Sequence, residues 1–498
     1  METYKLGKSR HLCWDDFLID KCETIELVMH KPIKKELALV ADKQWEGVCN
    51  GYASVKKIGD TYRLYYRACS SRYDIDGNSV RNLPPAYCLA LSSDGKSFKH
   101  PKLGVYDVVG RDNNIIYFEN KYVDNFAVIY DENPACPPEE KYKALKMGNE
   151  PGSKKPSLYL HTSPDGVHFD TGRLLDLDGE FDSYNVYFWD KETEQYFIYY
   201  RGCHWPRYSE YEETEGNTHE LRLLPNGDTN EVRDISVATT KDFISFENFG
   251  EIRFIDDDVK EDIQYYTNNI LKYPRADDMF IGIPARYINR KDDSKNFESM
   301  PVWEKRNKLI NVFGRGGTAL TDAIIITSRD GFNFRRTDEA FFTPSVECDA
   351  NWWYGDCFFA YGMEETESDV EGAPNELSIY VGEGYRVKNV HFRRYTLRLD
   401  GFFSWYAKYR GGLVLTKPFT FEGSELEINF ATSALGHVVI ALCDEEGNEI
   451  EGFKTGKLFG DSIDRKVEFQ NSLSALNGKP VRLKFEIKDA HLYSFKFN

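Results

Sequence analysis

The sequence predicts an all-β protein, and three observations lead to this fold class. One short turn pattern occurs five times, strand-like runs precede each copy, and runs with helical periodicity longer than two turns are hard to find. Aromatic residues make up 15% of the 498 residues, and aromatic side chains favour strands. Most of the chain is therefore expected to form repeated antiparallel sheets.

The turn pattern is a hydroxyl residue, any residue, Asp, usually Gly, two further residues and an aromatic residue, as in the segment from Ser92 to Phe98. Asp-Gly favours tight turns, and the Asp side chain can close the turn on the local backbone. We therefore interpret the aspartates of the five copies as structural rather than catalytic. They are Asp94, Asp165, Asp242, Asp330 and, in a degenerate copy, Asp400.

Three strand-like runs precede each turn, and in the first repeat they cover residues 52–56, 62–66 and 87–91. A fourth strand after the turn would complete an antiparallel meander. Five such sheets arranged around one axis form a five-bladed β-propeller. We place this propeller at residues 41–409.

The two ends of the chain differ from the repeats. Residues 410–498 contain short alternating runs separated by turn signals such as Asn477-Gly478, and this spacing predicts a C-terminal β-sandwich. Residues 1–40 precede the first repeat. We expect them to pack on the propeller, where they would cover the first blade or close the ring.

Composition excludes several classes of partner. Lys and Arg total 63 against 81 Asp and Glu, so the net charge is −18, which argues against nucleic acid or an anionic membrane as the main partner. No apolar stretch approaches the ~20 residues that span a bilayer. The first residues lack the apolar core of a signal peptide, and the ten cysteines suit reduced thiols. We expect a cytoplasmic protein.

A propeller carries its site at the mouth of the central channel, where the innermost strands begin. In this sequence each of those five segments holds a carboxylate or an amide beside an aromatic residue, a combination that suits sugars. Glycoside hydrolysis needs two carboxyl groups across the scissile bond, and carboxylates that share a pocket shift each other's pKa apart. We predict Glu46, Asp124 and Asp182 as catalytic, with Asp112 as a weaker candidate.

The same segments supply the predicted substrate-binding residues. Arg67 and Arg201 end parallel Tyr-Tyr-Arg runs and could orient a carboxylate or a substrate oxyanion. We predict no metal and no cofactor, because the histidines lack His-x-x-x-His spacing and residues 314–317 match no phosphate loop or dinucleotide fingerprint. The predicted binding residues are Trp45, Asn50, Arg67, Asn125, Asn185, Arg201, Gln264, Tyr265, Trp352 and Asp356.

The repeats, the carboxylates and the appended sandwich resemble the five-bladed propeller glycosidases, namely invertase- and levanase-like enzymes and their arabinanase-like relatives. A bacterial invertase-like group without an assigned substrate is most similar, through Trp45-Glu-Gly, Gly179-Glu-Phe-Asp-Ser-Tyr-Asn185, Ser328-Arg-Asp-Gly, Arg398-Leu-Asp-Gly-Phe and Lys488-Asp-Ala-His-Leu-Tyr493. The resemblance implies a glycosidase fold and chemistry.

Three acidic motifs of the invertase-like family are altered in this chain. Blade one offers Glu46 in place of the family's nucleophilic Asp. Arg111-Asp112 and Arg233-Asp234 lack the Pro of the Arg-Asp-Pro motif, and Glu347-Cys348 lies later than the family places its acid/base Glu-Cys pair. These departures argue against fructosidase specificity and leave glycosidase chemistry open.

Several functions remain compatible with the sequence. The leading hypothesis is an exo-acting glycoside hydrolase for small oligosaccharides, furanosides included. A second hypothesis is a glycoside phosphorylase, which would use arginines such as Arg201, Arg207 and Arg286 to bind phosphate. A third is a non-catalytic propeller, which would have the same fold and bind sugars without cleaving them. A sialidase would need three arginines, a tyrosine nucleophile and six blades, which five repeats fit poorly. A small carbohydrate is the expected partner, and a homo-oligomer is left open.

Overall fold

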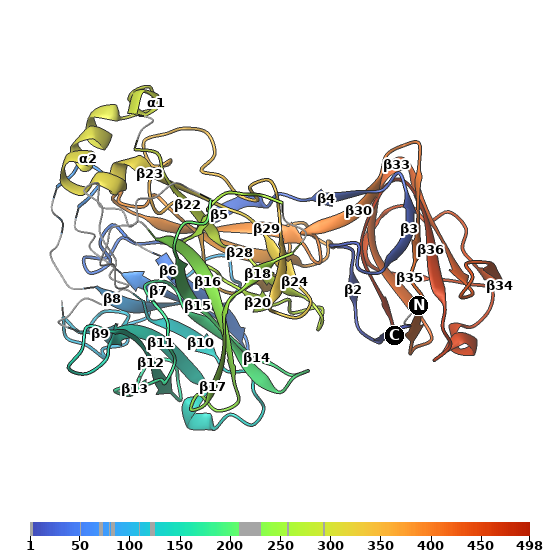
Figure 1. The fold of residues 1–498 in the computed structure, drawn as a ribbon, viewed down its shortest axis with the longest axis horizontal. Helices are drawn as coiled ribbons and strands as arrows, with labels where there is room; N and C mark the ends of the chain where they lie inside the picture. The colour runs from blue at the N-terminus through green and yellow to red at the C-terminus, as the bar shows by residue number, and fades with distance from the viewer. Residues whose placement is uncertain are drawn as a thin grey trace.

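A computed structural model describes residues 3–49, 51–68, 73–78, 80, 85–108, 110–119, 125–208, 231–255, 258–291 and 294–498. Figure 1 shows a large β-domain of radially arranged sheets beside a smaller β-domain that contains both chain ends. The predicted all-β fold class, with a propeller and a second β-domain, is confirmed. Among the described residues the large domain contains six sheets, which we group by the five repeats and call blades 1 to 5.

Blades 1 to 3 are four-stranded antiparallel meanders in chain order. The innermost strand of each blade comes first in the chain and the outermost comes last. Blade 1 contains β6 (Gly51–Ile58), β7 (Thr61–Ala68), β8 (Ala86–Ser92) and β9 (Ile115–Phe118); blade 2 contains β10 (Ala127–Tyr130), β11 (Tyr142–Asn149), β12 (Pro156–Ser163) and β13 (Arg173–Leu174), with η1 (Pro138–Glu140); blade 3 contains β14 (Val186–Asp190), β15 (Gln195–His204), β16 (Val232–Thr240) and β17 (Phe246–Glu251).

Blade 4 is divided into two sheets. Its main sheet contains β20 (Leu271–Lys272), β21 (Phe280–Gly282), β24 (Ile326–Ser328), β25 (Asn333–Arg336) and β18 (Arg253–Phe254), and an upper sheet contains β19 (Gln264–Tyr265), β22 (Ala285–Asn289) and β23 (Ala319–Ala323). Helices α1 (Ser294–Glu298) and α2 (Trp303–Thr318) lie between β22 and β23 in the chain. The sequence did not predict α2, because the glycines in its last turn weaken the helical pattern.

Blade 5 is completed by the N-terminal part of the chain. Its strands are β26 (Phe358–Phe359), β27 (Glu364–Thr366), β28 (Glu376–Glu383) and β29 (His391–Arg398), and β5 (Ile33–Val40) pairs with β29 on the outer side. Strands from opposite ends of the repeat region thus share one sheet, which links the last blade to the start of the chain. The N-terminal segment was expected to cover the first blade or to close the ring of blades, and β5 closes the ring by pairing with β29.

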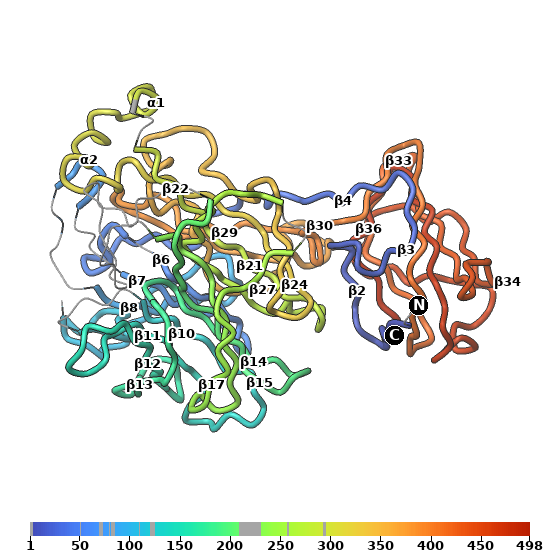
Figure 2. Tube along the Cα trace, in the orientation of Figure 1, coloured from blue at the N-terminus to red at the C-terminus, as the bar shows by residue number. Residues whose placement is uncertain are grey.

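The second domain also draws on both chain ends. It contains β1 (Tyr4–Gly7), β2 (His11–Leu12), β3 (Ile19–Glu23), β4 (Glu26–Met29), β30 (Phe403–Ala407), β31 (Gly412–Thr416), β32 (Phe419–Phe421), β33 (Leu426–Cys443), β34 (Glu449–Lys454), β35 (Asp461–Val467), η2 (Leu473–Leu476) and β36 (Arg482–Phe497). Because β1 to β4 pair with its strands, most of residues 1–40 lies in this domain and not on the propeller as expected. The tube in Figure 2 shows the N-terminal chain passing from this domain into the propeller.

Four of the five turn aspartates cap their turns as the sequence predicts. In the first repeat Asp94 Oδ1 accepts hydrogen bonds from the backbone N–H of Lys96 at 2.8 Å and Ser97 at 3.1 Å. Asp165, Asp242 and Asp330 make the same pair of bonds. Asp400 differs, because its side chain is fully buried at the boundary between the two domains.

Tyrosine hydroxyls near the centre of the propeller join different blades. The Tyr361 hydroxyl of blade 5 donates to the Tyr187 carbonyl of blade 3 at 3.0 Å, and the Tyr187 hydroxyl donates to the Ile129 carbonyl of blade 2 at 3.0 Å. The nine described cysteines form no disulfide. Within the described residues, no helix has the length and apolar character needed to cross a membrane.

Candidate functional site

Four aromatic rings lie where the innermost strands begin. The Tyr52 ring of blade 1 stacks on Tyr184 of blade 3, with centroids 5.7 Å apart, and on Phe358 of blade 5, with centroids 6.3 Å apart. Phe358 also stacks on Tyr266 at 5.7 Å. These near-parallel rings come from four blades and converge on the channel.

The backbone is strained at the same level. Tyr52, Phe181, Asn269 and Cys357 have φ values of 44°, 54°, 50° and 62°, in the left-handed region that residues with a side chain rarely adopt. Each lies at or just before an innermost strand of blades 1, 3, 4 and 5. Such strain persists only where surrounding contacts fix it, and it gathers at functional sites.

Two buried asparagines fix the strained segment of blade 3. Asn185 Nδ2 donates to the Phe181 carbonyl at 2.9 Å, and Asn125 Nδ2 donates to the same carbonyl at 3.3 Å. Asn125 Oδ1 accepts from the Met147 N–H at 2.8 Å. The next residue, Asp182, is exposed. The predicted residues Asn125 and Asn185 therefore position a loop that presents the predicted catalytic carboxylate to solvent.

Arg201 contacts this loop through its backbone, since its carbonyl accepts from the Glu180 N–H at 3.3 Å. Its guanidinium is 4% exposed, lies 5.0 Å from the Tyr266 ring centre and donates to the Tyr266 carbonyl at 2.6 Å. Burial lowers the pKa of Arg201, but the charges of Cys203 and Asp182 outweigh it and raise the pKa above its usual value. Asp182 and Arg201 are thus electrostatically coupled, as the sequence suggested.

Two further arginines surround the same tyrosines. The Arg233 guanidinium lies 4.8 Å from the Tyr287 ring and 5.4 Å from the Tyr266 ring, and the Arg315 guanidinium lies 5.0 Å from the Tyr354 ring. We call this group the arginine–tyrosine cluster. It comprises Arg201, Arg233, Arg315, Tyr266, Tyr287 and Tyr354.

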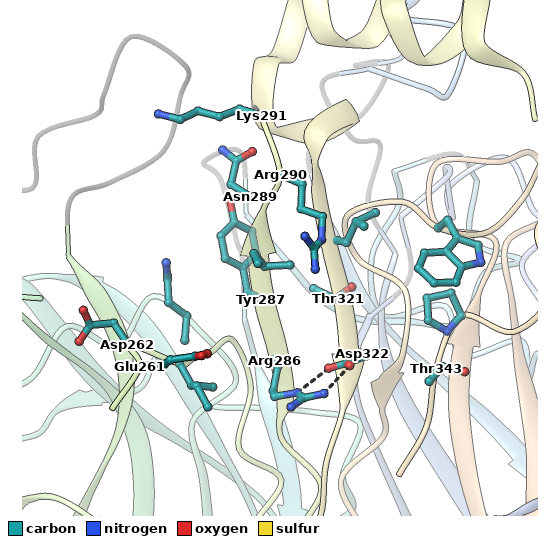
Figure 3. Close-up of a pocket in the computed structure, with 16 residues that line it drawn as sticks. Glu261, Asp262, Arg286, Tyr287, Asn289, Arg290, Lys291, Thr321, Asp322 and Thr343 are labelled. Carbon is teal, nitrogen blue, oxygen red and sulfur yellow. Dashed lines mark hydrogen bonds and ion pairs between the residues drawn. The ribbon is translucent and has the colours of Figure 1, made fainter. Parts of the chain in front are cut away.

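A cavity of ≈530 Å³ adjoins this cluster, and Figure 3 shows its lining. Tyr287 belongs to both, and Gln264 connects them, because it lines the cavity and its Oε1 accepts a hydrogen bond from Arg233. Arg286 and Asp322 form a two-point ion pair in its wall, at 2.8 and 2.6 Å. Trp352 also lines the cavity. The volume lies in the range of ordinary ligand sites.

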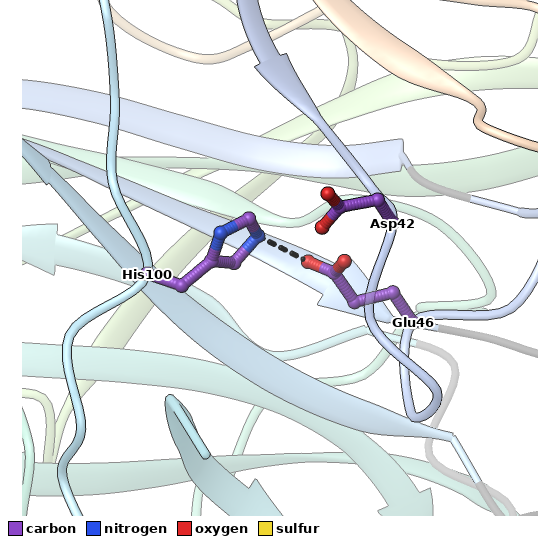
Figure 4. Close-up of side chains that lie close together, drawn as sticks. All are labelled: Asp42, Glu46 and His100. Atoms are coloured by element: carbon purple, nitrogen blue, oxygen red, sulfur yellow. Dashed lines mark hydrogen bonds and ion pairs between the residues drawn. The ribbon is translucent and has the colours of Figure 1, made fainter. Parts of the chain in front are cut away.

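Glu46 is not among the residues that line this cavity; Figure 4 shows it beside Asp42 and His100. Its side chain is fully buried, and its Oε1 accepts from the Tyr66 hydroxyl at 2.5 Å and lies 2.9 Å from His100 Nε2. Its Oε2 accepts from the Lys43 N–H at 2.8 Å. Trp45 beside it donates from Nε1 to Asn114 at 2.8 Å. Glu46 and Trp45 thus take part in the packing of blade 1, and the catalytic and binding roles expected for them stay predictions.

A Glu46→Gln variant should lose stability rather than activity. The amide keeps the shape but loses the charge that Tyr66 and His100 hydrogen-bond, which should cost roughly 1–3 kcal/mol. Chemical unfolding of both proteins, beside turnover on the substrate, measures this. A normal unfolding midpoint with lost turnover would instead assign Glu46 to catalysis.

The other predicted residues divide between the site and the scaffold. Arg67 lies 4.6 Å from the Tyr52 ring and donates to the Tyr385 hydroxyl at 3.4 Å, so it reaches the channel. Tyr265 points away from it, since its hydroxyl accepts from Arg336 at 2.8 Å; the next residue, Tyr266, takes the channel position. Asn50 and Asp124 lie outside the described residues, and Asp112 is exposed and paired with Lys102.

Asp356 is a buried turn cap with a shifted pKa. Its Oδ2 accepts from the Trp353 N–H at 2.8 Å, and burial raises its pKa to about 7. The folded protein therefore binds this proton more tightly than the unfolded chain, in which the pKa is about 3.9. The stability contribution of Asp356 must fall as the pH rises from about 4 to about 7.

An Asp356→Asn variant tests this shift. Its stability relative to the wild type should increase from pH 4 to pH 7 and stay constant above, because the amide has no proton to lose. Thermal unfolding across this range measures the difference, with the exposed Asp349→Asn variant as the control. A difference that does not change with pH would contradict the assignment.

Two groups of side chains have ligand atoms close enough to hold a metal ion. Asp42, Glu46 and His100 form one, and His204, Asp234 and Glu251 form the other. In the second group His204 Nδ1 lies 2.8 Å from Asp234, and Arg207 pairs with Glu251. Hydrogen bonds and ion pairs thus occupy ligand atoms of both groups.

Sequence reasoning missed Arg233, Arg315, Tyr266, Tyr287 and Tyr354. Arg233 lies on the third strand of blade 3, and Arg315 lies in the helical insertion of blade 4, so neither belongs to the start of an innermost strand. Tyr266 was one residue from the predicted Tyr265. Two signals were visible: the Gly314-Arg-Gly-Gly317 run, which matched no known motif, and Arg233-Asp234, which lacks the Pro of the family's Arg-Asp-Pro motif.

Comparisons with known proteins give fold-level likeness only. No protein family and no curated protein matches the sequence. An N-acetylgalactosamine deacetylase from F. plautii is 12% identical, with 74% of this chain and 94% of that chain covered and a TM-score of 0.41. A family 43 arabinoxylan arabinofuranohydrolase from Bacillus subtilis is 12% identical over 91% and 80%, with a TM-score of 0.32. A Dyadobacter fermentans protein of unknown function is 10% identical over 93% and 99%, with a TM-score of 0.37. These TM-scores are too low to transfer an activity.

Proposed function

We propose that the protein is a glycoside hydrolase that acts at the mouth of the propeller channel, exo-acting on small oligosaccharides. The observation that carries this proposal is the exposed Asp182 carboxylate on a loop fixed by Asn125 and Asn185, beside the buried Arg201. A carboxylate held in this way is preorganised to act on a bound sugar.

The second carboxylate of the proposed pair is Asp124. It directly precedes Asn125 in the chain. The Asn125 side chain holds the Asp182 loop through a hydrogen bond to the Phe181 carbonyl. Two carboxyl groups from adjacent blades would act as the acid and the base or nucleophile of glycoside cleavage. Trp352, which lines the neighbouring cavity, would supply a face on which a sugar ring packs.

Activity against a panel of glycosides tests this proposal. Nitrophenyl glycosides, furanosides included, and reduced oligosaccharides are incubated with the protein, and released sugar is measured with and without inorganic phosphate. Phosphate-independent release supports hydrolysis, and release that requires phosphate would make the protein a phosphorylase. If calorimetry shows that sugars bind but no product forms after long incubation, the protein is a non-catalytic sugar-binding propeller.

A further inference from the structure

The Gly314-Arg-Gly-Gly317 segment gives the end of helix α2 a compact shape. Phe313 leaves the helical conformation at φ −151° and ψ 65°. A Cβ atom on Gly316 would lie 2.4 Å from the Phe313 ring, and one on Gly317 would lie 2.5 Å from the Ile310 side chain. The glycines are therefore required by close packing, and together they fix the position of Arg315.

Helix α2 is itself anchored to the propeller by the buried Arg306. Its guanidinium donates to the Gly317 and Trp352 carbonyls, both at 2.8 Å, and lies 4.0 Å from the Trp353 ring. The end of the helix is thus tied to the loop that carries Trp352. Arg315 is therefore positioned at the channel by the anchored end of helix α2 and not by a free loop.

The Arg315 guanidinium has donor groups without acceptors. Within the described residues, its Nε and Nη1 atoms are buried and have no hydrogen-bond partner. Its neighbours are the rings of Tyr354 and Phe313, at 5.0 and 5.9 Å. Because a guanidinium has only donors, and an unmet buried donor is costly, this position calls for an acceptor that the described residues do not supply.

Carboxylates do not supply that acceptor among the described residues. Neither Arg315 nor Arg201 forms an ion pair there, whereas Arg286 in the adjoining cavity is paired with Asp322 at 2.6 Å. Both guanidinium groups lie around Tyr266 and Tyr354, whose hydroxyls are hydrogen-bonded to each other. Arg201 is buried and is also coupled to Asp182, and Arg315 is half-buried with two buried nitrogen atoms. Two positive charges in this setting favour an anion, since charges interact strongly away from water.

We propose that Arg315, together with Arg201, binds an anionic group of the substrate, so that the protein acts on an acidic carbohydrate. The group would be an oxyanion, either a sugar carboxylate or a phosphate or sulfate ester, and charge-assisted bonds from guanidinium groups would hold it. The sugar would occupy the cavity that shares Tyr287 with the cluster. This inference rests on the proposed function for the sugar, but the anion site stands on its own contacts.

Calorimetry and thermal unfolding with defined probes test the proposal. The probes are glucuronate, glucose 6-phosphate, glucose 6-sulfate, inorganic phosphate and neutral glucose. At least one charged sugar should bind and raise the unfolding temperature, and glucose should bind at least tenfold more weakly. Preference between glucuronate and the esters distinguishes the source of the oxyanion. Equal binding of charged and neutral sugars, or no binding of any charged probe, would overturn the proposal.

Variants locate the effect at Arg315. Arg315→Met should weaken binding of the charged probe at least tenfold, and the exposed Arg410→Met variant should bind like the wild type. Arg315→Lys keeps the charge and serves if the Met variant does not fold; it should show intermediate affinity. Unchanged affinity in either folded Arg315 variant would refute the assignment.

An Asp182→Asn variant separates this proposal from the proposed function. If it loses turnover while the Arg315 variants bind charged probes normally, the anion site is wrong and the glycosidase stands. If Arg315 controls binding of a charged sugar but no glycoside is cleaved, the anion site stands and the glycosidase is wrong.

Discussion

Replacing Asp400 with alanine is expected to lower the free energy of unfolding by roughly 3–5 kcal/mol, the cost of leaving buried opposite charges without their partner. Asp400 is fully buried. Its Oδ1 accepts from Arg275 at 2.8 Å and from the Tyr273 hydroxyl at 3.1 Å, both on the propeller. Its Oδ2 accepts from Ser494 at 2.7 Å and lies 3.4 Å from Arg10, both in the second domain. One carboxylate thus joins the two domains.

The effect of Asp400 should depend on pH in a defined direction. Burial raises its pKa, but the charges of Arg275 and Arg10 outweigh burial and hold the pKa below its usual value. A carboxyl group with a lowered folded-state pKa stabilises above the unfolded-state pKa, about 3.9, and this stability is lost as pH falls through the folded-state pKa. The difference between wild type and variant should be full at pH 7 and decrease below about pH 4.

Urea unfolding followed by tryptophan fluorescence measures this loss, since Trp14 donates to the Asp400 carbonyl at 2.8 Å. The control is Asp94→Ala, which removes the equivalent aspartate of the first repeat but only local turn bonds, worth about 1 kcal/mol. Asp400→Asn keeps the shape and should lose less than alanine. Equal losses in the Asp94 and Asp400 alanine variants would show that Asp400 is an ordinary turn cap.

An Asp182→Asn variant should lose roughly 10²–10⁴-fold in kcat, the usual contribution of a positioned acid or base. Its fold should be unaffected, because the side chain is exposed while Asn125 and Asn185 hold the loop through the backbone. The measurement is kcat and KM on the substrate found in the glycoside panel, beside the unfolding temperature.

The matched control for Asp182 is Asp178→Asn. Asp178 is 80% exposed, lies four residues earlier and pairs with Lys155 at 2.6 Å. It should keep wild-type turnover. Full turnover in the Asp182 variant would show that this residue is not catalytic. The next sequence-predicted carboxylate to test would then be Asp124.

Local sequence was sufficient for the repeat architecture. Alternating side chains define a strand, and Asp-Gly turns end it, so segments such as 62–66 and 87–91 were found within β7 and β8. The same logic located Asn125 and Asn185 near the channel. It could not tell that their side chains hold Phe181, because that contact joins blade 2 to blade 3.

Errors arose where a residue's neighbours come from distant segments. Period-two alternation shows that a strand has two faces but not which neighbour each face meets, so the sequence did not show that the Tyr266 ring, beside the predicted Tyr265, stacks on Phe358. Glu46 precedes the first strand of blade 1 as predicted, but its carboxylate is hydrogen-bonded to Tyr66 and His100 within the packing of that blade.

The sequence by itself determined the all-β class, the five repeats and the structural role of four turn aspartates, because each depends on residues within one strand or turn. Only the tertiary structure decided that β1 to β4 belong to the second domain, that Asp400 joins the domains, and that Arg315 reaches Tyr354. These outcomes depend on contacts between segments up to hundreds of residues apart, and such contacts are selected by packing and charge pairing that no local pattern records.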